Sequence, residues 1–122
     1  MTLAAMLFVG TGSAVGAASR YAIGQGIAKV NRSDFPWGTW IVNMAGTFLL
    51  GLIFQEFSVI HHNHNAWLLL GTGFCGAFTT FSTMSIEVVN LFRKRLFLGM
   101  LYLSTSLVLG FVLAWVPQWW MP

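Results

Sequence analysis

Asn43 is the polar residue with the clearest chemistry, because it lies within residues 35–55, a run without any charged side chain. Thr39 and Thr47 lie four residues before and after it, so the three side chains share one face of a helix. The Asn43 amide offers two donor hydrogens and one acceptor oxygen, and burying them unpaired costs a few kcal/mol. It therefore needs another helix, water or an ion as its partner, and a hydrogen bond between helices is the ordinary alternative.

A second group of polar residues lies in segment 71–85, which contains three glycines and six Ser or Thr residues. Each glycine weakens a helix by up to about 1 kcal/mol, and non-helical backbone survives at membrane depth only where it is buried or lines a site. We therefore expect a break between Gly73 and Thr80 that frees carbonyl groups to hold a cation, as in the broken helices of transporters. Single hydroxyl groups usually bond to their own helix, which explains some of these six residues.

Several other residues have the chemistry to line a path for an ion. Tyr102 and Ser106 are one helical turn apart and predict a track of hydroxyl groups. Phe74, Phe78 and Phe81 have the ordinary interpretation of simple packing, but the positive edges of such rings also attract an anion in a narrow polar path.

Three ionisable residues lie inside or at the rim of apolar runs, and one of them, Glu56, is expected to be interfacial without a function. Arg20 either extends its charge to the membrane surface or forms an electropositive entrance to an anion path. Glu87 follows Thr83 by one turn, and it is placed to balance Arg20 or a bound cation. A cluster of three histidines at 61, 62 and 64 has no neighbouring carboxylate or cysteine to complete a metal site, which favours a solvated loop.

The elements that hold these residues follow from composition. The chain has 122 residues, of which 57% are hydrophobic and 7% charged, which excludes a water-soluble domain. The net charge of +3 includes no basic stripe, which argues against a nucleic-acid partner. Because about 20 helical residues cross a bilayer, the uncharged runs predict one four-helix transmembrane domain over residues 1–122, with helices at about 3–27, 37–56, 66–92 and 97–117. We expect the first segment to be a retained helix, not a signal peptide.

The connections between these helices indicate an orientation and an assembly. Five Lys or Arg residues lie in the first and third connections and none in the second, which places the first and third in the cytoplasm. Six tryptophans lie near helix ends, as expected for interfacial residues. Gly12 and Gly16 form a small-residue surface for close helix approach, either within the chain or between subunits.

Four motifs together resemble the Fluc/CrcB fluoride channel family over essentially the whole chain. They are GxxxGAxxRY from Gly12, PxGTxxxNxxG from Pro36, GFCGxxTTFST from Gly73, and then Glu87. The resemblance implies an all-α membrane protein with four transmembrane helices, a broken third helix and an antiparallel, dual-topology dimer with two fluoride pores. It implies a channel that passively exports fluoride across the bacterial inner membrane and reduces fluoride toxicity in the cytoplasm.

The resemblance also implies roles for single residues. Backbone carbonyls of Gly76 and Thr79 would hold a structural Na⁺ at the dimer centre. Asn43 would donate to fluoride, Phe81 would be the first of two pore phenylalanines, and Arg20 matches the first-helix arginine of the family. The remaining predicted pathway residues supply hydroxyl groups, and they are Ser82, Thr83, Tyr102 and Ser106.

This sequence departs from the family pattern in two ways. Met84 replaces the second pore phenylalanine, and a thioether lacks the fixed positive edge of a ring, so we expect altered conduction or selectivity. The charge asymmetry favours a fixed orientation and an oppositely oriented paralogue as partner, whereas the resemblance implies a homodimer, which we keep as the default.

Two other functions are alternatives to the channel. A small multidrug-resistance type transporter also has four short helices, but it needs a carboxylate within its first helix, and none is present here. A noncatalytic subunit of a larger membrane complex explains the glycines, but not the combination of Asn43 with a hydroxyl-rich third helix. No motif for enzymatic catalysis is found.

Overall fold

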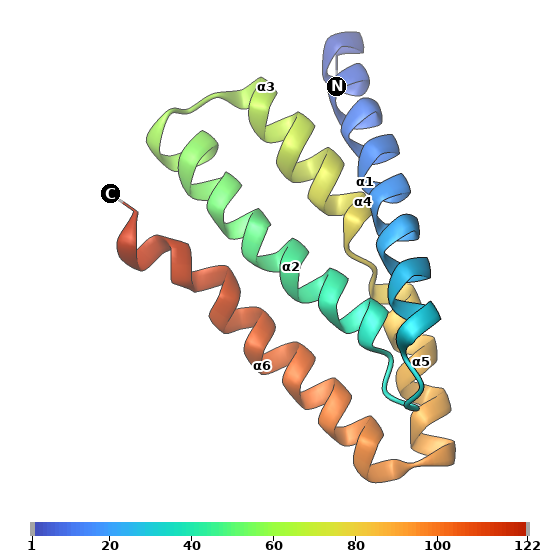
Figure 1. Ribbon diagram of the computed structural model, residues 1–122. Helices are drawn as coiled ribbons and strands as arrows, with labels where there is room; N and C mark the ends of the chain where they lie inside the picture. Colours follow the sequence, from blue (N-terminus) through green and yellow to red (C-terminus); the bar gives the residue numbers. More distant parts are fainter. Residues whose placement is uncertain (1, 122) are drawn as a thin grey trace.

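The computed structural model describes residues 2–121, which are helical almost throughout and contain no strand (Figure 1). The elements in chain order are α1 (Leu3–Val30), α2 (Trp37–Ile53), η1 (Phe54–Ile60), α3 (His64–Ala66), η2 (Trp67–Cys75), α4 (Gly76–Phe78), α5 (Phe81–Lys94) and α6 (Leu96–Trp120). Here η1 and η2 are π-helical stretches that continue the neighbouring α-helices. The elements form four long rods, which confirms the predicted all-α class and the four helices.

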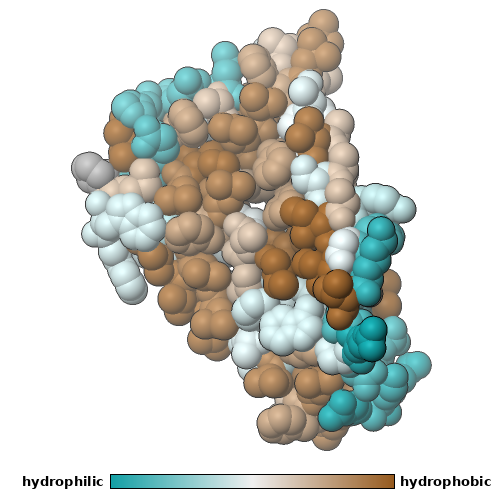
Figure 2. All heavy atoms as spheres, in the orientation of Figure 1, coloured by the Kyte–Doolittle hydropathy of each residue, from teal (hydrophilic) through white to brown (hydrophobic). Residues whose placement is uncertain are grey.

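Three of these rods are long and apolar enough to cross a membrane, namely Leu3–Val30, Trp37–Ile60 and Leu96–Trp120. The second continues past the predicted end at residue 56, because η1 adds residues to the end of α2. Hydrophobic side chains cover the middle of the molecule, whereas hydrophilic residues gather at two opposite ends (Figure 2). This distribution is that of a membrane protein, whose apolar side chains face lipid.

The remaining rod is interrupted. The helical path ends at Phe78, and Thr79 and Thr80 are extended, with ψ of 156° and φ of −145° respectively. A new helix, α5, begins at Phe81, where the Thr80 hydroxyl accepts a hydrogen bond of 3.3 Å from the Thr83 backbone N–H. A threonine that caps the next helix favours this local arrangement, because it satisfies a donor of the first turn of α5.

Small residues bring α1 against η2 and α4. A Cβ atom at Gly12 would overlap the Leu69 carbonyl oxygen, and one at Gly16 would overlap the Phe74 carbonyl oxygen. A Cβ atom at Gly73 would lie 2.8 Å from the carbonyl oxygen of Val9. Gly12 and Gly16, for which the sequence left two interpretations open, therefore form a contact within the chain.

The other faces pack through larger side chains. Near its end, α2 approaches α6 at Gly51, where an added Cβ would lie 2.7 Å from the Ala114 carbonyl oxygen. Helices α5 and α6 enclose a small core, to which Phe35 of the first connection also contributes. The core consists of Phe35, Met84, Val88, Leu91 and Tyr102. This core includes Met84, which lies one turn after the interruption, in the first part of α5.

Polar side chains contact one another at both ends of the molecule. At one end, the Asp34 carboxylate accepts from Lys94 at 3.0 Å and lies 3.5 Å from Arg95, so the first and third connections meet. The hydrogen bond and positive charge of Lys94, with a smaller contribution from Arg95, lower the pKa of Asp34 below its ordinary value. At the other end, His61 Nε2 lies 2.8 Å from the carboxylate of Glu56 in η1.

Candidate functional site

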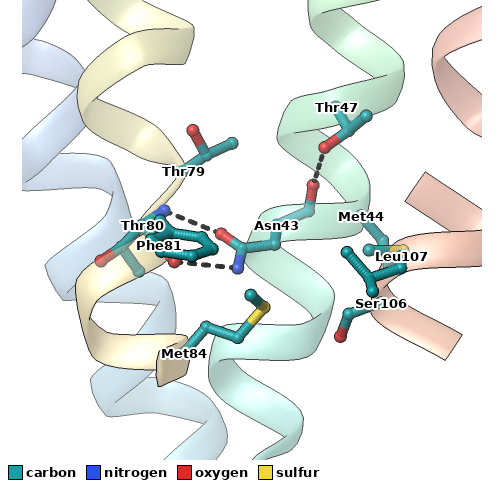
Figure 3. A pocket seen from close by; sticks show the side chains of 9 residues that line it. All are labelled: Asn43, Met44, Thr47, Thr79, Thr80, Phe81, Met84, Ser106 and Leu107. Carbon is teal, nitrogen blue, oxygen red and sulfur yellow. Dashed lines mark hydrogen bonds between the residues drawn. The ribbon is translucent and has the colours of Figure 1, made fainter. Parts of the chain in front are cut away.

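A cavity of about 190 Å³ lies between α2, the interrupted rod and α6 (Figure 3). Its walls combine amide, hydroxyl, thioether and apolar groups, and none of them is charged; they come from Asn43, Met44, Thr47, Thr79, Thr80, Phe81, Met84, Ser106 and Leu107. The fold thus brings four of the predicted pathway residues together, although they come from three rods.

Asn43 is buried, and its side chain makes two hydrogen bonds to one residue. Its Oδ1 accepts from the Thr80 backbone N–H at 2.8 Å, and its Nδ2 donates to the Thr80 carbonyl at 3.1 Å. The Thr47 hydroxyl donates to the Asn43 backbone carbonyl at 2.6 Å, within α2. Asn43 therefore joins α2 to the extended segment. This agrees with the ordinary alternative for a buried Asn, which is a hydrogen bond to another part of the bundle.

Ser106 and Met84 line the cavity from buried positions, whereas Phe81 is exposed. The Ser106 side chain is 8% exposed, and its hydroxyl has no hydrogen-bond partner among residues 2–121. Met84 is 7% exposed, and the Phe81 ring is 75% exposed at the rim. A buried hydroxyl without a protein partner is free to donate to water or to an ion.

Four predicted pathway residues do not line this cavity, namely Ser82, Thr83, Tyr102 and Arg20. Ser82 and Thr83 are exposed on the outside of α5. Tyr102 is fully buried in the small core, and its hydroxyl donates to Glu87 Oε1 at 3.1 Å. Glu87 is therefore paired with Tyr102 and forms no ion pair with Arg20, contrary to one of our expectations.

Arg20 lies apart from the cavity on α1, and its charge has no carboxylate partner among the described residues. The Arg20 Nε atom is buried and has no hydrogen-bond partner in that part of the chain. Arg20 therefore neither lines this cavity nor forms an ion pair with a described residue. Its predicted role at an entrance to the anion path stays a prediction.

Two carbonyl groups at the interruption have lost their helical partners. In a continuous helix the Gly76 carbonyl accepts from the N–H of residue 80, but that N–H donates to Asn43. The Thr79 carbonyl would accept from the N–H of residue 83, but that N–H donates to the Thr80 hydroxyl. Both carbonyls are thereby left to other partners, and oxygen atoms of this kind suit a hard cation. Over residues 2–121, no group of three or more His, Cys, Asp or Glu side chains gathers to hold a metal.

Three features of the cavity were not predicted from the sequence, namely the side chains of Met44 and Leu107 and the peptide groups of Thr80. Met44 and Leu107 are ordinary apolar residues in apolar helices, so no pattern distinguishes them from lipid-facing neighbours. The Thr80 peptide groups become visible only where the extended backbone faces Asn43.

The fold and the cavity define a small all-helical membrane protein with an uncharged polar site. Residues 7–118 match the family described as CrcB-like protein, Camphor Resistance (CrcB). The protein named fluoride-specific ion channel FluC of Ruminiclostridium cellulolyticum is 47% identical, over 87% of this chain and 88% of its own. Fluoride-specific ion channel FluC 2 of Clostridium acetobutylicum is 42% identical over 84% of this chain and 85% of its own.

A third relative is fluoride-specific ion channel FluC 1 of Carboxydothermus hydrogenoformans, which is 39% identical over 93% of this chain and 90% of its own. Because the family match and these relatives cover most of the sequence, the chain belongs to the CrcB family.

Proposed function

We propose that this protein is a fluoride-selective ion channel that carries fluoride passively across the bacterial inner membrane and thereby lowers fluoride in the cytoplasm. It is a channel protein and not an enzyme. The observation that carries the proposal is a cavity lined from two candidate membrane spans, whose polar groups are neutral and include the donors Asn43 and Ser106. The names of the relatives support fluoride as the ion.

Neutral donors suit this ion for a physical reason. Fluoride is small and strongly hydrated, so a pore must replace its water with hydrogen-bond donors and still release the ion. A buried lysine or arginine would hold the anion too tightly, and none lines this cavity. Asn43 and Ser106 offer weaker dipoles, and the Phe81 ring adds a positive edge at the rim.

A dimer completes the pathway in this proposal. The outer face of the interrupted rod carries polar or small groups that lipid would leave without partners, namely Thr72, Gly76, Ser82 and Thr83, with Phe81 exposed beside them. A second subunit placed against this face would cover it and provide the other wall for Phe81. We propose an antiparallel arrangement in which Ser82 and Thr83 donate to the ion, and the broken third rod of each subunit crosses the membrane once.

The same arrangement would hold a Na⁺ ion at the dimer centre. What supports this is the pair of carbonyl groups at Gly76 and Thr79 whose helical N–H partners bond elsewhere. Gly76 also leaves room for an ion, because the nearest atom to an added Cβ is the Gly71 carbonyl oxygen at 4.0 Å. Na⁺ would supply fixed positive charge near the two pores without blocking either.

The partner in this dimer is either a second copy or an oppositely oriented paralogue. Five Lys or Arg residues lie at the end of the molecule where Asp34 joins the connections, which favours one fixed orientation. Tags on both termini in cells without a paralogue will separate the two arrangements. Tags on both sides of the membrane support the homodimer, and tags on one side support the paralogue pair.

Fluoride efflux from liposomes, measured with a fluoride electrode, tests the proposed function. The unaltered chain should release fluoride and retain chloride, and Phe81→Ile should reduce efflux about tenfold, since a rate falls tenfold for each 1.4 kcal/mol added to the barrier. Ser85→Ala is the matched control, because its hydroxyl donates only to the Phe81 carbonyl of its own helix, at 2.9 Å. Efflux equal to that of protein-free liposomes contradicts the proposal, and proton-coupled drug movement would support the multidrug transporter instead.

A further inference from the structure

We propose that Asn43 is a positioning residue for the helix interruption, and that the Thr80 peptide in turn fixes the direction of the Asn43 amide (Figure 3). One side chain would then do two things. It would keep residues 79–80 extended, and it would present a donor, not an acceptor, to the cavity. The flux part of this inference rests on the proposed function, whereas the stability part does not.

The backbone of Thr80 departs from the helical hydrogen-bond pattern. In a continuous helix the Thr80 N–H would donate to the Gly76 carbonyl, and the rod would have no interruption. Here that N–H donates to Asn43 Oδ1 at 2.8 Å, while the Thr80 carbonyl accepts from Asn43 Nδ2 at 3.1 Å. The Asn43 side chain thus binds both peptide groups of Thr80 in place of helical partners. In the same way, a residue on a neighbouring antiparallel strand binds the N–H and carbonyl of an extended residue.

The Thr80 peptide also determines the orientation of the Asn43 amide. If the Asn43 amide were rotated by half a turn, its NH₂ group would face the Thr80 N–H and its oxygen would face the Thr80 carbonyl. Both hydrogen bonds would be replaced by repulsive contacts, so the Thr80 peptide selects one orientation. In that orientation Oδ1 is bound to Thr80, and one amide hydrogen has no partner among residues 2–121.

The orientation of this amide affects which ion the cavity favours. Asn43 lines it from α2, and Ser106 lines it from α6 with a hydroxyl that has no hydrogen-bond partner in the described part of the chain. An amide that is held by its oxygen offers the cavity a hydrogen atom, which favours an anion over a cation. The selectivity of this wall for anions therefore depends on a backbone peptide that need not touch the ion.

Asn43→Asp separates the two roles, because a carboxyl group changes with pH. As a carboxylate it accepts from the Thr80 N–H but repels the Thr80 carbonyl. As a neutral acid it restores both hydrogen bonds, since its carbonyl oxygen accepts and its O–H donates. The neutral acid then has no hydrogen left for the cavity. Asn43→Leu has a similar size and does not titrate, so it is the matched control.

The experiment measures the melting temperature in detergent and the fluoride efflux from liposomes, each at pH 8 and pH 5.5, with protein-free liposomes as the efflux background. At pH 8 both variants should melt on the order of 5–10 °C below the unaltered chain, because Asn43→Leu loses two buried hydrogen bonds and Asn43→Asp replaces one of them by a repulsive contact. At pH 5.5 only Asn43→Asp should recover. Its efflux should nevertheless stay about tenfold or more below that of the unaltered chain.

Three results would overturn the inference. The first is a melting temperature that neither variant changes, and the second is an Asn43→Asp variant that fails to recover stability in acid. The third is full efflux from Asn43→Asp at pH 5.5, which would show that the second amide hydrogen is not needed. If the unaltered chain releases no fluoride, the proposed function fails, but the melting temperatures still decide whether Asn43 positions the interruption.

Discussion

Two regions of this molecule use small and polar residues in opposite ways. Along α1 and η2, Gly12, Gly16 and Gly73 bring two backbones into direct contact, and nothing else fits between them. Between α2, α5 and α6, the hydroxyl and amide residues surround a cavity of about 190 Å³. The sequence has glycines and hydroxyl groups in both regions, so residue type alone does not distinguish a packing surface from a binding surface.

The difference lies in what satisfies the polar groups. In the first region the close contact is backbone against backbone, and the Ser13 hydroxyl donates to the Gly73 carbonyl at 3.4 Å. In the second region the Ser106 hydroxyl has no partner among the described residues, although it is buried. A buried polar group without a partner costs free energy, and it is retained where it serves a ligand.

The largest effect is expected from Gly12→Val, which breaks the packing region. The added Cβ would overlap the Leu69 carbonyl oxygen and lie 2.9 Å from the Phe74 backbone nitrogen, so α1 must move away from η2. We expect a loss of about 3 kcal/mol or more, seen as a lower melting temperature and a lower yield of folded protein. Gly10→Val is the control, because nothing lies within 4 Å of a Cβ there. Equal losses in both variants would show that the contact is not the cause.

Ser106→Ala should affect function without affecting stability. Because this hydroxyl has no hydrogen-bond partner among residues 2–121, removing it breaks no hydrogen bond seen there, and the free energy of unfolding should change by less than about 0.5 kcal/mol. Fluoride efflux should fall about tenfold, because one donor to the ion is lost. A clear loss of stability, or normal efflux, would place Ser106 with the packing residues instead.

Met84→Phe tests how a buried thioether differs from an aromatic ring at the cavity. We expect efflux or the preference for fluoride over chloride to change by about threefold, since the ring brings a fixed positive edge and the site must accommodate a bulkier group. Efflux and chloride retention are measured together in liposomes, beside the unaltered chain. Unchanged values for both would mean that Met84 supports packing alone, as its 7% exposure and its place in the small core also allow.

The smallest effect is expected from Asp34→Asn, far from both regions. The pKa of Asp34 is lowered in the folded protein by the hydrogen bond and charge of Lys94, so its contribution to stability is present above the ordinary carboxyl pKa. That contribution is lost as the pH falls through the lower folded value. Melting temperatures at pH 7 and pH 3 should therefore show a small deficit of the variant at pH 7 and none at pH 3. Fluoride efflux at pH 7 should be unchanged.

Much of the site follows from sequence patterns because its residues are out of place in lipid. Asn43 and Ser106 were predicted from polarity and spacing, Phe81 and Met84 from the family resemblance, and these four line one cavity. Thr79, which the resemblance implies as a cation ligand, also lies at this cavity. Tyr102 was predicted from its one-turn spacing to Ser106, yet it lies in the small core against Glu87. Spacing on one helix places two side chains on the same face, but it does not say which neighbour each of them meets.

The sequence by itself determined the four helices, their approximate ends and the polar residues that membrane burial makes costly, because composition and helical periodicity are local properties. Only the tertiary structure decided that Gly12 and Gly16 pack within the chain, and that the interruption falls at Thr79 and Thr80. It also decided that Asn43 bonds the Thr80 peptide. These outcomes depend on which rod lies against which, and a hydrogen bond across 37 positions has no local signature in the sequence.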